Sequence, residues 1–226
     1  MNKVLMILTG VGMSSIARKW IMALTGLFLC FFLLGHLLGN LILITGADAK
    51  EAFNDYAEFM GTNPGVQVLR LVTYAGILFH IVYAVALTIK NKKARSQKYA
   101  YTSALPQNSS LASKIMIHLG VIILVFLVLH LYSFWYKHNF VGYEGMDVDN
   151  LYDMVVMKFK NPYYSGFYVL AMGFLAYHLA HGFKSGFQSL GFNHPKYSPL
   201  IEKLGLGFAI VVPLLFAVIP ICLYLM

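Results

Sequence analysis

Long apolar stretches constrain this chain more than any other feature of its sequence. A helix needs about 20 predominantly apolar residues to cross the hydrocarbon core of a bilayer. The chain has 226 residues, of which 59% are hydrophobic and 12% are charged, and its mean hydropathy is +0.68. We therefore predict an all-α integral membrane protein in which residues 1–226 form a single membrane domain. Five transmembrane helices are expected, at residues 20–44, 66–89, 115–136, 163–187 and 204–226.

The segments between the spans carry their own signals. Residues 1–15 are apolar but too short to span, so we expect an interfacial arm there. In the first loop, AKEAFNDYAEFM has the 3.6-residue apolar period of a short surface helix. The loop at residues 138–162 ends in Asn161-Pro162, which is expected to start the fourth span. The last span has no histidine and is expected to be a lipid-facing scaffold, kinked at Pro213 and Pro220.

The basic residues predict which way the spans run. Cytoplasmic loops of membrane proteins carry an excess of Lys and Arg. A cytoplasmic N-terminus places twelve basic residues inside and five outside, and it places eight of the nine acids outside. The net charge of +8 is therefore interpreted as a basic cytoplasmic surface rather than as a nucleic-acid site. The twelve are Lys3, Arg18, Lys19, Lys90, Lys92, Lys93, Arg95, Lys98, Lys114, Lys184, Lys196 and Lys203; the five are Lys50, Arg70, Lys137, Lys158 and Lys160.

Four histidines lie inside four different spans, and they fall at two depths. At 1.5 Å per residue, His36 and His130 lie roughly 22 to 24 Å from the cytoplasmic ends of their spans, whereas His80 and His178 lie roughly 9 to 14 Å from theirs. Each depth therefore has one imidazole from each of two helices. Two imidazoles from facing helices are what a planar haem needs as axial ligands. The pattern predicts a four-helix bundle with two b-type haems, one towards each face.

Other interpretations of these histidines remain open at this point. A single intramembrane histidine is as often hydrogen-bonded within the core as it is a ligand. His181 competes with His178, because it lies three residues further along nearly the same helix face. Ordinary polar roles are expected for His118, His138 and His194. A haemless membrane anchor and a transporter with a histidine proton relay are the alternative functions, although no predicted span contains Asp or Glu.

Several short motifs occur in one order along the chain. They are TGLFL and LLGHLLGN in the first span, EAFNDYAEFM in the first loop, LFHIVY in the second span, LHLY in the third and HLAHGFKSGFQSLG in the fourth. In this order and spacing they resemble the five-span di-haem cytochrome b membrane subunit of succinate:quinone oxidoreductases. That family includes succinate dehydrogenases and fumarate reductases. The resemblance covers nearly the whole chain.

The resemblance implies a role, partners and ligands. It implies a membrane anchor in the bacterial cytoplasmic membrane that transfers electrons between an iron-sulfur subunit and the membrane quinone pool, for which menaquinone is expected. It pairs His36 with His130 and His80 with His178 as haem iron ligands. His178 is preferred because it lies four residues before Gly182, which leaves His181 in the haem vicinity. The direction of the reaction, succinate oxidation or fumarate reduction, stays open.

The dicarboxylate chemistry is expected to reside in other polypeptides. The chain has two cysteines, Cys30 and Cys222, which are too few for an iron-sulfur cluster, and it has no dinucleotide-binding fingerprint. A flavoprotein subunit and an iron-sulfur subunit are therefore expected to dock on the basic cytoplasmic face. As a subunit of that complex, the chain would contribute to an enzyme without binding the dicarboxylate.

Two regions are candidates for the quinone site. Glu58, in the first outer loop near the start of the second span, is a candidate acid/base group for quinone protonation. Ser15, Lys19 and Trp20 form the alternative, because SIARK at the cytoplasmic end of the first span is similar to the quinone-side pattern of related subunits. Both sets also have ordinary interpretations, a solvated loop acid and an interfacial basic anchor.

Overall fold

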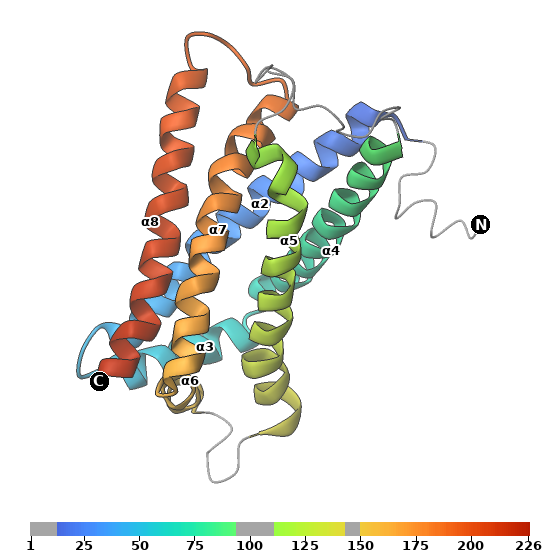
Figure 1. Ribbon diagram of the computed structural model, residues 1–226. Helices are drawn as coiled ribbons and strands as arrows, with labels where there is room; N and C mark the ends of the chain where they lie inside the picture. Colours follow the sequence, from blue (N-terminus) through green and yellow to red (C-terminus); the bar gives the residue numbers. More distant parts are fainter. Residues whose placement is uncertain (1–12, 94–110, 143–149) are drawn as a thin grey trace.

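The computed structural model describes residues 13–93, 111–142 and 150–226, and the regular elements in these ranges are all helices (Figure 1). The expected interfacial arm at residues 1–15 lies almost entirely outside the described residues. The elements are α2 (Ser15–Leu41) with a 3₁₀ turn (Ile42–Ile44), α3 (Ala49–Thr62), α4 (Pro64–Lys93), α5 (Leu111–His130) with a π-helical extension (Leu131–Val141), α6 (Leu151–Phe159), α7 (Pro162–Ser189) and α8 (Ser198–Leu225).

Four helical segments in the described part of the chain are long and apolar enough to cross a membrane. They are Ser15–Ile44, Pro64–Lys93, Ile115–Val141 and Ser198–Leu225. The fifth predicted span, at residues 163–187, forms the 28-residue helix α7 but is not among them. The physical reason is composition, because Tyr, Gly and His residues interrupt the apolar residues of α7. The prediction of five spans is therefore not confirmed, while the all-helical membrane class is.

Short polar segments start two of the helices, α7 where the sequence predicted and α2 five residues before the predicted span. Asn161 caps α7, because its Oδ1 accepts hydrogen bonds from the backbone N–H groups of Tyr163 and Tyr164, and Pro162 occupies the first turn. Proline is tolerated there because that position has no intrahelical N–H bond to lose. Ser14 caps α2 in the same way, with its Oγ 3.1 Å from the N of Ala17. The predicted helix start at Asn161-Pro162 is thus confirmed.

Helix α7 lies at the centre of the molecule and packs against α2, α5 and α8 (Figure 1). Its most extensive contact is with α8, which returns antiparallel to it after a turn that contains Gly191 at φ +89°. The expectation that the last span is only a lipid-facing scaffold is wrong, because α8 buries Ala209, Val212 and Leu223 in the core. This helix runs through both of its prolines, Pro213 and Pro220, as one element, and the predicted kinks stay a prediction.

The close packing of α7 and α8 depends on a glycine. A Cβ built on Gly205 of α8 would lie 2.5 Å from Cδ1 of Phe183 on α7, which is closer than real Cβ atoms approach, whereas a Cβ on Gly207 meets nothing within 4 Å. We expect Gly205→Ala to destabilise the protein by about 1 to 3 kcal/mol through overpacking. Gly207→Ala, two residues away, is the matched control and is expected to be neutral or stabilising by up to about 1 kcal/mol. Thermal unfolding in detergent measures both; equal midpoints would contradict the expectation.

Two short helices, α3 and α6, close one end of the bundle (Figure 1). The surface helix predicted in the first loop is confirmed as α3, but α6 was missed, because its segment was interpreted as a loop. Both helices face inward as well as outward. Phe53 of α3 and Val155 and Phe159 of α6 belong to the same buried cluster as Leu43 and Leu223. The two loop segments that form α3 and α6 are therefore a structural cap with apolar anchors.

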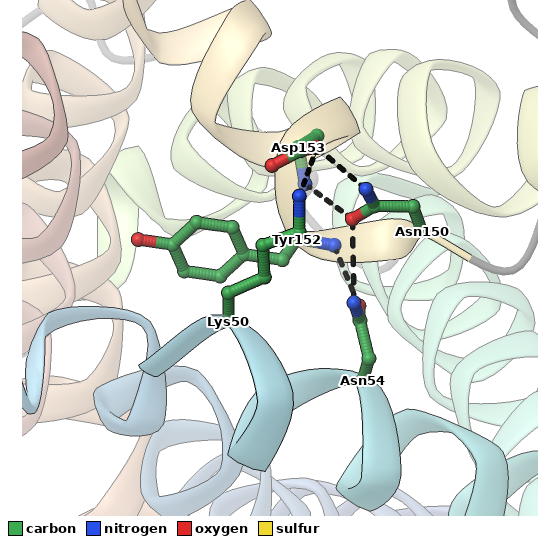
Figure 2. A network of polar contacts seen from close by, with 5 residues as sticks. All are labelled: Lys50, Asn54, Asn150, Tyr152 and Asp153. Carbon is green, nitrogen blue, oxygen red and sulfur yellow. Dashed lines mark hydrogen bonds and ion pairs between the residues drawn. The ribbon is translucent and has the colours of Figure 1, made fainter. Parts of the chain in front are cut away.

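Polar side chains hold α6 against α3 (Figure 2). Asn150 caps α6, with its Oδ1 accepting from the backbone N–H of Asp153 at 3.1 Å and from Nδ2 of Asn54 at 3.3 Å. Asn54 returns the contact through its Oδ1, which accepts from the backbone N–H of Tyr152 at 3.0 Å. Lys50 and Asp153 add an ion pair at 2.6 Å on the exposed side. The two amides thus tie segments that lie about a hundred residues apart in the chain.

The opposite end of the bundle is basic. The starts of α2, α5 and α8 and the ends of α4 and α7 meet there, as alternating helix directions require (Figure 1). Seven lysines of the described residues are exposed at this end, and Lys184 among them pairs with Glu202 at 2.7 Å. The seven are Lys19, Lys90, Lys92, Lys93, Lys184, Lys196 and Lys203.

Candidate functional site

The first histidine pair lies between α2 and α5, on the side of the bundle nearer the cap. The ring centroids of His36 and His130 are 5.8 Å apart, with the ring planes at 89°. Aromatic rings surround the pair. Phe32 stacks on His36 at 5.4 Å and Phe126 on His130 at 5.8 Å, while Phe216 of α8 lies 5.7 Å from His36. The imidazoles therefore sit among apolar rings contributed by three helices.

A chain of phenols reaches the same pair from α7. The Nδ1 of His130 lies 3.2 Å from the hydroxyl of Tyr168, which in turn lies 2.9 Å from the hydroxyl of Tyr164. His36 has a weaker neighbour, because Nδ2 of Asn40 lies 3.5 Å from its Nδ1 and already donates to the His36 carbonyl at 2.7 Å. One imidazole of this pair thus has a firm hydrogen-bond partner.

The second pair lies between α4 and α7, nearer the basic end. The ring centroids of His80 and His178 are 6.3 Å apart, with the ring planes at 69°. Gly26 of α2 leaves room for the His80 ring, because a Cβ at that position would lie 3.1 Å from Cε1 of the imidazole. On α7, His178 makes this ring contact, and its neighbour His181 is half-buried one turn further on. The two pairs match the two depths expected from the sequence.

The nitrogens of the second pair differ in their partners. Nδ1 of His80 lies 3.4 Å from Oγ1 of Thr25, whose hydroxyl also lies 2.8 Å from the carbonyl oxygen of Ile21. Nδ1 of His178 is buried and has no hydrogen-bond partner among the described residues. Burying an imidazole nitrogen without a hydrogen-bond partner costs free energy.

Both pairs have the dimensions of a bis-imidazole site. A metal held in line by two imidazoles at about 2 Å each separates the ring centres by roughly 6 Å. The observed separations are 5.8 and 6.3 Å. These separations fit a haem iron between the members of each pair. Within the described residues, no group of three or more His, Cys, Asp or Glu side chains has the geometry of a metal site.

The structure keeps the two candidate quinone regions at opposite ends. Glu58 is exposed on α3, at the capped end. Ser15, Lys19 and Trp20 are exposed on the first turns of α2, where Nζ of Lys90 donates to Oγ of Ser15. Beside them, Arg18 donates from Nη2 to the carbonyl of Met13 at 2.9 Å, while its buried Nε has no partner in the described part of the chain.

Sequence reasoning missed the polar groups that contact the histidines. Thr25 lies 55 residues before His80, and Tyr168 lies 38 residues after His130. Neither belongs to a local motif, because each contact crosses from one helix to another. Gly26 likewise permits the close approach of α2 to the His80 ring, a contact between helices 54 residues apart in the chain.

Comparison of the chain with protein-family models, with curated proteins and with solved structures finds no match. A function for the chain is therefore inferred from the motif resemblance and from the geometry of the two histidine pairs.

Proposed function

We propose that this chain is the membrane anchor and di-haem cytochrome b subunit of a succinate dehydrogenase or fumarate reductase complex. It would transfer electrons between the iron-sulfur subunit and the membrane quinone pool. The observation that carries the proposal is the juxtaposition of four histidines from four helices as two pairs, with ring centres 5.8 and 6.3 Å apart. Neither alternative function, haemless anchor or transporter, requires two such pairs.

In this proposal His36 and His130 bind the haem nearer the cap, and His80 and His178 bind the haem nearer the basic end. A b-type haem between two imidazoles has no open iron position, so it supplies one-electron transfer rather than oxygen chemistry. The aromatic rings of Phe32, Phe126 and Phe216 exclude water from the first pair. His181, one turn beyond His178, stays in the vicinity of the second haem.

Helix α7 is proposed as the fifth span. It contacts α2, α5 and α8, and the packing buries Tyr168 and partly buries Tyr164, His178 and His181. Polar residues in a membrane segment are tolerated where they face the interior of the bundle. The resulting five-span topology places the N-terminus and the basic end in the cytoplasm of a bacterial cell, and the cap of α3 and α6 outside.

The partners follow from that orientation. The flavoprotein and iron-sulfur subunits would dock on the basic end, where the exposed lysines complement an acidic partner surface. Menaquinone is the proposed quinone. Glu58 at the capped end and Ser15, Lys19 and Trp20 at the basic end are its two candidate sites, and inhibitor protection of one set from chemical labelling would distinguish them.

Visible spectroscopy of the purified complex tests the proposal. The expected result is a reduced-minus-oxidised b-type spectrum with two haems per chain, together with co-purification of a flavoprotein and an iron-sulfur protein. A featureless spectrum from protein prepared with adequate haem supply would overturn the cytochrome assignment. A spectrum without the two partners would leave a cytochrome of another complex and overturn the succinate dehydrogenase assignment.

A further inference from the structure

In each histidine pair, one histidine contacts a side-chain hydroxyl group. The hydroxyl belongs to a different helix from the histidine. Oγ1 of Thr25 on α2 lies 3.4 Å from Nδ1 of His80 on α4. The hydroxyl of Tyr168 on α7 lies 3.2 Å from Nδ1 of His130 on α5. In both cases the contacted nitrogen is Nδ1, which leaves Nε2 for another partner. The second histidine of each pair has no comparable hydroxyl partner among the described contacts.

The Thr25 hydroxyl acts as a hydrogen-bond acceptor towards His80. Its proton is directed at backbone oxygens of its own helix, at 2.8 Å from the Ile21 carbonyl and 3.1 Å from the Met22 carbonyl. The oxygen of Thr25 must therefore accept, so Nδ1 of His80 carries the proton and donates. A neutral imidazole protonated on Nδ1 has its lone pair on Nε2. The contact thus favours the tautomer that presents Nε2, and the backbone of Met22 is a second hydrogen-bond partner of His80.

Tyr168 offers the same selection to His130. Its hydroxyl lies between Nδ1 of His130 at 3.2 Å and the hydroxyl of Tyr164 at 2.9 Å, and the Tyr168 side chain is buried at 7% exposure. When Tyr168 donates to Tyr164, it accepts from Nδ1–H of His130. The ring of Phe126, 4.9 Å from Tyr168 and 5.8 Å from His130, packs beside both. The phenol is thus held where it meets the imidazole.

We propose that Thr25 and Tyr168 are positioning residues, each of which fixes the tautomer and ring orientation of one histidine in one pair. The inference rests on the proposed haem ligation by His80 and His130. A hydrogen bond from the distal N–H of a metal-binding imidazole orients the ring and raises its basicity as a ligand. A more basic ligand stabilises the oxidised iron, so each hydroxyl lowers the midpoint potential of its own haem and leaves the other unchanged.

Midpoint potentials of the two haems in the intact complex test this assignment. Tyr168→Phe is expected to raise the potential of the haem held by His36 and His130 alone. Thr25→Val is expected to raise that of the haem held by His80 and His178 alone. Thr25→Ser retains the hydroxyl and is expected to restore the wild-type value. The two haems are assigned beforehand from variants that lack one ligand histidine.

Thr73→Val is the matched control. Thr73 is buried on α4 and its hydroxyl donates to the Leu69 carbonyl at 2.9 Å, so its loss is expected to leave both potentials unchanged. Two bound haems with unchanged potentials in both Tyr168→Phe and Thr25→Val would overturn the inference while the proposed function stands. A shift of the same size in Thr25→Ser as in Thr25→Val would overturn it for Thr25. Wild-type protein without haem would instead refute the proposed function.

Discussion

The His130→Ala variant is expected to bind one haem per chain instead of two, because the removed imidazole is half of one bis-histidine site. His36→Ala is expected to lose the same haem, since the two rings lie 5.8 Å apart in one pair. His80→Ala and His178→Ala are expected to lose the other haem and to keep the first. Haem content and low-temperature visible spectra of the four purified variants measure this pattern. The His36 and His130 variants are expected to share one spectrum, and the His80 and His178 variants the other.

Two further variants make the ligation experiment sharper. His118 is exposed on α5, and His118→Ala is expected to keep both haems, which controls for histidine loss as such. His181→Ala is expected to keep both haems as well, because His178 makes the ring contact with His80. If His181→Ala lost a haem and His178→Ala kept both, the ligand on α7 would be His181. Loss of both haems from every variant would contradict two independent pairs.

Reversing the charge at the end of α4 is expected to abolish assembly with the soluble subunits. Lys90, Lys92 and Lys93 are exposed in the last turn of α4, at the end that gathers most of the described basic residues. Replacing all three with Glu changes the local charge by six units, which sets like charges against an acidic docking surface. Co-purification of the flavoprotein and iron-sulfur subunits, measured at physiological and at low ionic strength, reports the loss.

The control for that experiment lies at the capped end. Arg70 on α4 and Lys160 after α6 are exposed there, and replacing both with Glu is expected to leave assembly unchanged. Because the Debye length is about 8 Å at 0.15 M salt, charges at the far end of the bundle do not influence docking. Assembly lost only in the Arg70 and Lys160 variant would place the partners at the capped end and reverse the orientation.

Local signals predicted the helices well and their mutual burial poorly. The α7 start was predictable because Asn161 and Pro162 act on the turn that follows them, and α3 because its apolar period needs no distant partner. Helix α6 was missed because nine residues are too few to show a clear period, and because its anchors, Val155 and Phe159, are buried only by contacts with other helices. The role of α8 was misjudged for the same reason.

In the candidate site too, properties along one helix were predictable and contacts between helices were not. Sequence by itself determined the membrane class, the positions of the four histidines along their helices and hence their two depths, because a helix converts residue number into height at a constant rise. Only the tertiary structure decided which neighbours meet them: Thr25 at His80, Tyr168 at His130 and Gly26 against the His80 ring. Depth follows from distance along one helix, whereas lateral contact depends on how helices far apart in the chain rotate and pack together.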